Sequence, residues 1–116
     1  MVAGARRWWV ATAVLSLTVH LLALYWPVVT VAGPVSWTDK AVHVLVFAIP
    51  TYAVGMVVAR LWWAVTGFAA HALVSELSQH LLLPGRSGDP WDVVADLAGV
   101  ALAAVALVVS RRVARW

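Results

Sequence analysis

The chain has 116 residues, of which 64% are hydrophobic and 11% charged, and its mean hydropathy is +0.92. Because soluble globular domains are about 45–50% apolar and about 25% charged, this composition excludes an ordinary water-soluble globule. The formal net charge is +3, but the basic residues lie at the ends of apolar runs, as in membrane proteins, so we expect no nucleic-acid partner. The absence of cysteine excludes disulfides, thiol nucleophiles and cysteine-ligated metals.

Four apolar segments of bilayer length follow one another along the chain. We predict membrane-spanning helices at about 8–26, 37–59, 61–83 and 91–109. Tryptophans lie near the ends of these segments, as in the aromatic belt of membrane proteins. The short connections leave no room for a second domain. The predicted fold is therefore an all-α integral membrane protein, a four-transmembrane-helix bundle that forms a single domain over residues 1–116.

The charged residues divide between the two ends of the predicted helices. One end carries arginines and no acidic residue: Arg6, Arg7, Arg60, Arg111, Arg112 and Arg115. The positive-inside rule places this end, and with it both termini, in the cytoplasm. All acidic residues lie toward the other end, together with Lys40 and Arg86. We therefore expect the functional chemistry in the outer half of a multi-pass protein.

Polar residues of the second, third and fourth predicted helices lie at one depth. At about 1.5 Å per residue, His43, Glu76 and Asp96 each lie about 22–25 Å from the arginine-bearing end of their helices. At about 100° per residue, Asp39 shares a face with His43, and Asp92 shares a face with Asp96. Ionisable groups inside a bilayer face a bundle interior or a wet cavity and have partners. We expect the three helices to meet around these side chains.

The candidate binding site is an outer polar cluster, for which we predict these members: Asp39, Lys40, His43, Glu76, Gln79, Arg86, Asp89, Asp92 and Asp96. Lys40 and Arg86 would bind anionic groups, and the carboxylates would bind amines or cations. Gly99 and Ala103, four residues apart, predict a small-residue face on which a neighbouring helix approaches closely.

The acidic residues also have structural alternatives. Asp39 and Asp89 lie where they could cap the helices that begin beside them. Glu76 and Asp96 are too deep for capping, and their alternative is an ion pair or a shared proton that locks the bundle. His43 has the same alternative.

A metal site is a less favoured interpretation of the same residues. The pairs with i, i+4 spacing, which can present two ligands to one ion, are Asp39 with His43, Glu76 with His80, and Asp92 with Asp96. Such pairs are common in helices, and neither an HExxH motif nor a cysteine set accompanies them. We therefore expect no metal and no cofactor.

A second cofactor alternative involves His20 and His71. These residues lie at comparable depth in the first and third predicted helices, which would suit a bis-histidine haem. Hydrogen bonding between helices is the more common role of such residues. The position of His71, about 140° around the helix from Glu76, excludes it from the outer polar cluster.

The ordered polar residues resemble one known family. The segments Asp39-Lys40-x-x-His43, Glu76-x-x-Gln79, Pro84-Gly85-Arg86-Ser87-Gly88-Asp89 and Asp92-x-x-x-Asp96-x-x-Gly99 resemble the VanZ-like family of small bacterial four-helix membrane proteins. The likeness covers about residues 37–103. It implies a bacterial plasma-membrane protein with a link to teicoplanin resistance, and it implies no settled reaction. Asp96 stands where the family often has asparagine, and His80 lies outside the pattern.

These observations favour a binding protein with an accessory role in glycopeptide resistance or in the cell envelope. Its expected partners are membrane lipids and a lipid-linked cell-envelope component or another membrane protein. One alternative is a small intramembrane enzyme acting on a lipid-linked substrate, with His43 beside carboxylates as a general base. Another is a component of proton- or cation-linked transport. The sequence identifies no catalytic residue.

Overall fold

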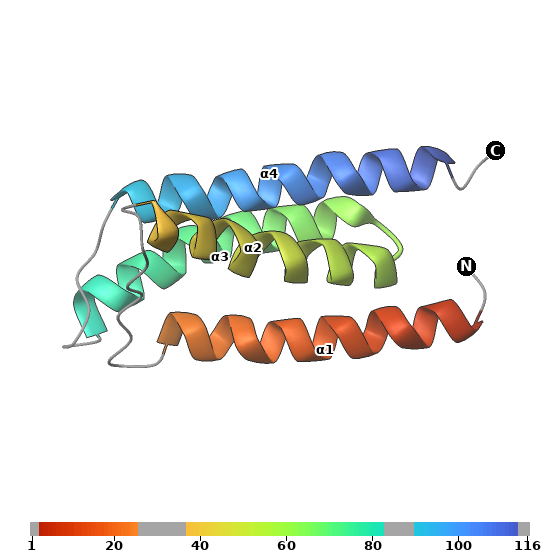
Figure 1. The fold of residues 1–116 in the computed structure, drawn as a ribbon, viewed down its shortest axis with the longest axis horizontal. Coiled ribbons are helices and arrows are strands. Elements are labelled where there is room, and N and C mark those ends of the chain that lie inside the picture. The colour runs from red at the N-terminus through yellow and green to blue at the C-terminus, as the bar shows by residue number, and fades with distance from the viewer. Residues whose placement is uncertain (1–2, 26–36, 83–89, 114–116) are drawn as a thin grey trace.

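The computed structural model describes residues 3–25, 37–82 and 90–113, and these form four helices. The helices are α1 (Ala3–Tyr25), α2 (Thr38–Val57), α3 (Leu61–Leu82) and α4 (Pro90–Val113). They run alternately up and down, so that the start of α1, the end of α4 and the connection from α2 to α3 lie at one end (Figure 1). The starts of α2 and α4 lie at the other end. The all-helical prediction is confirmed for this part of the chain.

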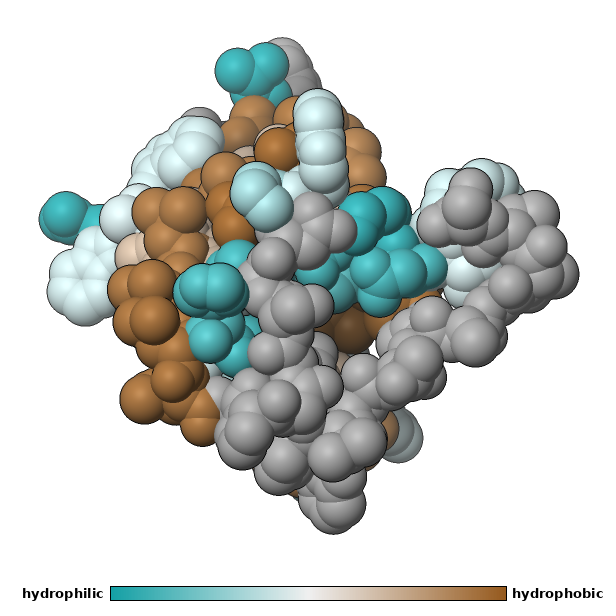
Figure 2. Space-filling model, turned by 90° about the vertical axis from the view of Figure 1, so that its left-hand side faces the viewer, coloured by the Kyte–Doolittle hydropathy of each residue, from teal (hydrophilic) through white to brown (hydrophobic). Residues whose placement is uncertain are grey.

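The bundle buries polar side chains together with an apolar core and exposes large apolar side chains. Buried polar side chains come from all four helices: His20, His43, Thr51, Ser75, Glu76, Gln79, Asp92 and Asp96. Large apolar side chains such as Leu15, Trp63 and Val105 are more than half exposed. An end-on view shows hydrophilic residues between hydrophobic ones (Figure 2). This distribution is typical of a protein surrounded by lipid, because water would not favour such a surface.

Three of the described helices, α1, α2 and α4, are long and apolar enough to cross a membrane. Helix α3, the third predicted span, is not among them. Its second half carries polar residues, of which Ser75, Glu76 and Gln79 are buried within the bundle. These buried polar residues lower the hydropathy of α3.

Two helices extend beyond the predicted spans. Helix α1 begins at Ala3 and α4 continues to Val113, so both include arginines that the hydropathy pattern excluded. Hydropathy locates the apolar part of a helix, whereas backbone hydrogen bonding continues into polar turns. Helices α2 and α3 match the predicted 37–59 and 61–83 to within two residues.

Helices α2 and α4 pack closely because a glycine lies between them. A Cβ atom added to Gly99 would collide with the backbone oxygen of Val44 and would lie 3.1 Å from the backbone nitrogen of Ala48. Ala103, the other residue of the predicted small-residue face, is buried. Only glycine at position 99 lets the two backbones approach to this distance.

Arg111 joins the far ends of the same two helices. Its guanidinium donates hydrogen bonds to the backbone oxygens of Gly55 at 2.7 Å, Val58 at 2.8 Å and Ala59 at 2.8 Å. The last carbonyls of a helix have no partner within it. Arg111 of α4 therefore caps the C-terminal end of α2.

Candidate functional site

Five residues of the predicted outer polar cluster come together where α2 and α4 begin. We call them the α2–α4 cluster: Asp39, Lys40 and His43 from α2, and Asp92 and Asp96 from α4. Residues four positions apart lie one turn apart on the same face of a helix. The close packing at Gly99 brings these two faces together one turn further along α4.

Asp96 orients the imidazole of His43. The His43 Nδ1 lies 2.7 Å from Asp96 Oδ1, and the two side chains are buried, with Asp96 0% and His43 8% exposed. An ionised carboxylate only accepts hydrogen bonds, so Nδ1 carries the hydrogen and donates it. The second oxygen, Asp96 Oδ2, is buried and has no hydrogen-bond partner among the residues described. The hydrogen bond from His43 therefore fixes the orientation of both side chains.

The other ring nitrogen of His43 faces two carboxylates. Its Nε2 lies 3.6 Å from Asp92 Oδ2 and 3.8 Å from Asp39 Oδ1, which is too far for hydrogen bonds. Lys40 Nζ contacts the remaining oxygen of each carboxylate, Asp39 Oδ2 at 3.1 Å and Asp92 Oδ1. Each of these carboxylates thus has one oxygen on the ammonium and one turned toward the imidazole.

The capping alternative for Asp39 is not observed. Helix α2 begins after Trp37, which makes no side-chain capping hydrogen bond, and Asp39 lies within the first turn. A carboxylate in this turn interacts favourably with the helix dipole. Its oxygens contact Lys40 and face His43, so it belongs to the cluster.

The α2–α4 cluster carries more negative than positive formal charge. It has three carboxylates and one ammonium, and His43 adds at most one further positive charge. Exposure decreases inward: the Lys40 and Asp39 side chains are 34% and 38% exposed, whereas Asp96 is completely buried. The arrangement can accept a cation or an amine at its exposed side and hold its charge against the buried carboxylate.

Of the remaining predicted site residues, two are described by the structure, Gln79 and Glu76 of α3. Gln79 of α3 donates from its amide to the backbone oxygen of Leu24 at 2.7 Å, which joins α3 to the last turn of α1. Glu76, one turn earlier in α3, is buried. The predicted members Arg86 and Asp89 lie outside the described residues.

A second polar group, the histidine chain, joins α1, α2 and α3 and consists of Tyr25, His71, His20 and the backbone oxygen of Val46. The distances are 2.7 Å from Tyr25 Oη to His71 Nε2, 3.0 Å from His71 Nδ1 to His20 Nε2, and 2.8 Å from His20 Nδ1 to Val46 O. A carbonyl only accepts, so His20 Nδ1 donates to Val46, His71 Nδ1 donates to His20, and Tyr25 donates to His71. Every imidazole in this chain is satisfied as a neutral group.

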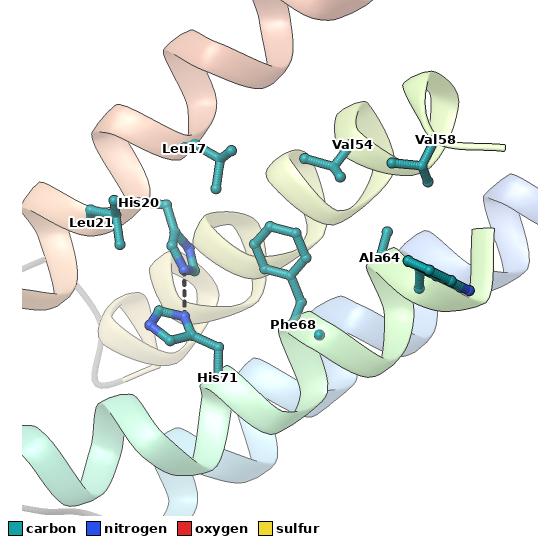
Figure 3. Close-up of a pocket in the computed structure, with 10 residues that line it drawn as sticks. Leu17, His20, Leu21, Val54, Val58, Ala64, Phe68 and His71 are labelled. Atoms are coloured by element: carbon teal, nitrogen blue, oxygen red, sulfur yellow. Dashed lines mark hydrogen bonds between the residues drawn. The ribbon is translucent and has the colours of Figure 1, made fainter. Parts of the chain in front are cut away.

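This geometry does not fit the haem alternative. Axial histidines lie on opposite sides of a haem iron, whereas the His20 and His71 nitrogens share one hydrogen bond (Figure 3). The structure has the other predicted arrangement, a hydrogen bond between His20 of α1 and His71 of α3. Tyr25 is a member of this group that was not predicted, and its only signal in the sequence is a tyrosine near the end of an apolar segment that also holds His20.

A mostly apolar pocket of about 370 Å³ adjoins the histidine chain. It lies between α1, α2 and α3, and its lining includes Leu17, Leu21, Val54 and Phe68 beside the two histidines (Figure 3). The aromatic rings of Phe47 and Phe68 pack edge-on against His20. The histidine chain is therefore a polar connection within apolar packing, in contrast to the charged α2–α4 cluster.

Comparison of the chain with protein-family models, with curated proteins and with solved structures finds no match.

Proposed function

We propose that the chain is a multi-pass protein of the bacterial plasma membrane with both termini in the cytoplasm. Three described helices are apolar enough to span a bilayer. Arg6, Arg7, Arg60, Arg111 and Arg112 lie at the end of the bundle where α1 starts and α4 ends. Positively charged residues favour the cytoplasmic side, which leaves the α2–α4 cluster at the outer surface.

Cysteine labelling tests this orientation, because the natural sequence has no cysteine. In intact cells an impermeant maleimide should label Ser87→Cys and should not label Ala3→Cys. The reverse pattern would place the α2–α4 cluster on the cytoplasmic side and contradict the proposal.

At that surface the protein binds the polar head of a cell-envelope component, in the accessory role that the resemblance to the VanZ-like family implies. The observation that carries this proposal is the charge of the α2–α4 cluster, three carboxylates for one ammonium at the ends of two apolar helices. A cationic or amine-bearing head group complements this excess, and Lys40 already shows how an ammonium joins Asp39 to Asp92. The apolar helices keep the ligand's lipid part in the bilayer.

The test is lipid co-purification followed by mass spectrometry. The wild-type protein should retain an amine-bearing or lipid-linked envelope component that Asp92→Asn retains at a lower level. Arg60→Gln, a change of charge at the opposite end of the bundle, is the matched control and should leave retention unchanged. Identical lipid profiles in the three proteins would contradict the proposal.

An enzymatic role is the second candidate, and the His43–Asp96 pair is the observation that favours it. A carboxylate on Nδ1 orients an imidazole so that Nε2 can accept a proton from water or a hydroxyl group. Incubation of the purified protein with envelope lipids should then release a water-soluble product, and His43→Gln should abolish the release. An unchanged lipid pool would exclude this second candidate and leave the binding role.

A further inference from the structure

Three atoms of the α2–α4 cluster are arranged like the ligands of one metal ion. Asp39, His43 and Asp92 each offer one ligand atom, and these atoms lie within 4.8 Å of one another; His43 Nε2 faces Asp39 Oδ1 and Asp92 Oδ2. The two distances from Nε2, 3.6 and 3.8 Å, exceed hydrogen-bond length. Nitrogen and oxygen ligands at about 2.0–2.2 Å from a tetrahedral Zn²⁺ lie about 3.4 Å apart. Small movements of side chains toward a common centre would therefore complete the coordination.

Lys40 leaves the correct oxygens free for this coordination. Its ammonium takes Asp39 Oδ2 and Asp92 Oδ1, which are the oxygens turned away from His43. The carboxylates are thus fixed in an orientation in which their other oxygens face Nε2. Lys40 partly balances their charge without occupying the position between the three ligand atoms.

Asp96 supplies an independent observation. Metal-binding histidines characteristically donate their second ring hydrogen to a carboxylate or carbonyl oxygen, which fixes the tautomer and raises the basicity of the ligand nitrogen. His43 does this toward Asp96 at 2.7 Å. The completely buried Asp96 has one oxygen, Oδ2, without a hydrogen-bond partner in the described part of the chain. A divalent ion on Nε2 would bring positive charge toward this buried carboxylate through the imidazole.

We propose that the α2–α4 cluster binds a divalent cation of the Zn²⁺ type through Asp39, His43 and Asp92, with Asp96 as the residue that positions His43. An imidazole ligand selects such ions over Mg²⁺ and Ca²⁺, which prefer oxygen ligands. Three protein ligands leave a coordination position for an oxygen atom of the head group, and the ion then supplies the positive charge that the carboxylates would otherwise take from a cationic head group. This inference rests on the proposed function, because it places a metal ion in the same site, and it replaces the expectation of no metal drawn from the sequence.

The competing explanation is a proton on Nε2. An imidazolium between three carboxylates would also balance Asp96, and it would require no metal ion. The two explanations differ in one measurable property. Only the metal site binds one equivalent of Zn²⁺, or of the spectroscopic probe Co²⁺, and loses this binding when a coordinating residue is replaced.

The experiment uses the full chain in detergent after treatment with a chelator. Titration with Co²⁺ should give one equivalent of bound ion with visible absorption, and Zn²⁺ should displace it. Asp92→Asn and His43→Gln should abolish the absorption. Asp96→Asn keeps all three ligands and should weaken binding about 10- to 100-fold, as expected for a positioning residue. His80→Gln, which changes an exposed histidine of α3, is the matched control and should bind as the wild type does.

Two results would overturn the inference: no stoichiometric binding by the wild-type protein, or equal binding by Asp92→Asn and His80→Gln. Helix content measured by circular dichroism identifies any variant that fails to fold. If Asp92→Asn or His43→Gln fails to fold, the Co²⁺ binding of Asp96→Asn is compared with that of the wild-type protein instead. The lipid co-purification, repeated with chelator, separates the two proposals. Lipid retention without metal binding overturns the metal site alone. Metal binding with unchanged lipid profiles supports the metal site and overturns the proposed function.

Discussion

The protein buries histidines in two clusters, and the two clusters differ in the chemical kind of partner that each histidine has. In the α2–α4 cluster the partners of His43 are carboxylates, and an ammonium lies beside them. In the histidine chain the partners of His20 and His71 are a carbonyl, a phenol and each other. The first group combines charged side chains with an excess of carboxylates, and the second joins neutral groups by directed hydrogen bonds.

The charge of its partners therefore determines how strongly the loss of a buried histidine lowers the stability of the protein. A charge left unpaired in an apolar interior destabilises a protein far more than a neutral group that loses one hydrogen bond. We therefore expect substitutions in the α2–α4 cluster to have larger effects than substitutions in the histidine chain. The free energies of unfolding of variants in the two clusters test this ranking.

The largest effect is expected for His43→Leu, which leaves the buried Asp96 without its partner. We expect the free energy of unfolding to fall by at least about 3 kcal/mol, because a buried carboxylate loses its hydrogen-bond partner. Unfolding in mixed micelles by denaturing detergent, followed by circular dichroism, measures the change. Adding Asp96→Leu should restore most of the lost stability, and a double variant as unstable as the single one would contradict the charge-balance explanation.

The next effect concerns the packing on which the charged cluster depends. Gly99→Ala should destabilise the protein by about 1–3 kcal/mol, because the added methyl group meets the backbone of α2. Gly67→Ala is the matched control in α3, near the histidine chain, where an added Cβ meets nothing within 4 Å. The control should be neutral or slightly stabilising, since alanine favours helix more than glycine does. Equal effects at the two positions would show that the α2–α4 contact is not the tighter one.

A smaller effect is expected for His20→Leu in the histidine chain. The change removes two hydrogen bonds between helices but leaves no charge unpaired. Such bonds contribute on average about 0.6 kcal/mol in membrane proteins, so we expect a loss of about 1 kcal/mol. The same unfolding assay applies. A loss of stability as large as that of His43→Leu would mean that the histidine chain carries a charge. The two clusters would then not differ in charge.

The smallest effect is expected for Tyr25→Phe, which removes only the terminal hydrogen bond to His71. The ring is kept, so we expect a loss of about 0.5–1 kcal/mol, the net value of one hydrogen bond. If stability rises instead, Tyr25 Oη does not donate to His71. The donors and acceptors of all three hydrogen bonds in the histidine chain must then be reassigned.

Helical periodicity predicted part of the α2–α4 cluster, because depth and face are properties of a single helix. They placed Asp39 with His43 on one face and Asp92 with Asp96 on another, at matching depths. They could not show that Lys40 bridges Asp39 and Asp92, because that contact depends on the rotamer of a long side chain and on the rotation of two helices. The structure supplied that contact.

Contacts that depend on the order of helices in the bundle were also beyond the sequence. Gln79 was grouped with the charged residues by its level along α3, but its amide contacts the last turn of α1. His71 was excluded from the outer polar cluster by its angle around α3, and the structure agrees in placing it with His20. The angle showed where His71 does not point, whereas its partners, His20 and Tyr25, depend on how α1 packs against α3.

The cap that Arg111 forms on α2 also bears on how the protein is made. In the proposed topology α2 leaves the ribosome before α4, so its terminal carbonyls and His43 are synthesised before their partners, which lie more than 50 residues later in the chain. Both ends of α2 are completed by the same helix, at Asp96 and at Arg111. Helix α2 therefore gains both contacts only after α4 has been synthesised, and a chain truncated before Arg111 would lack the cap on the C-terminal end of α2.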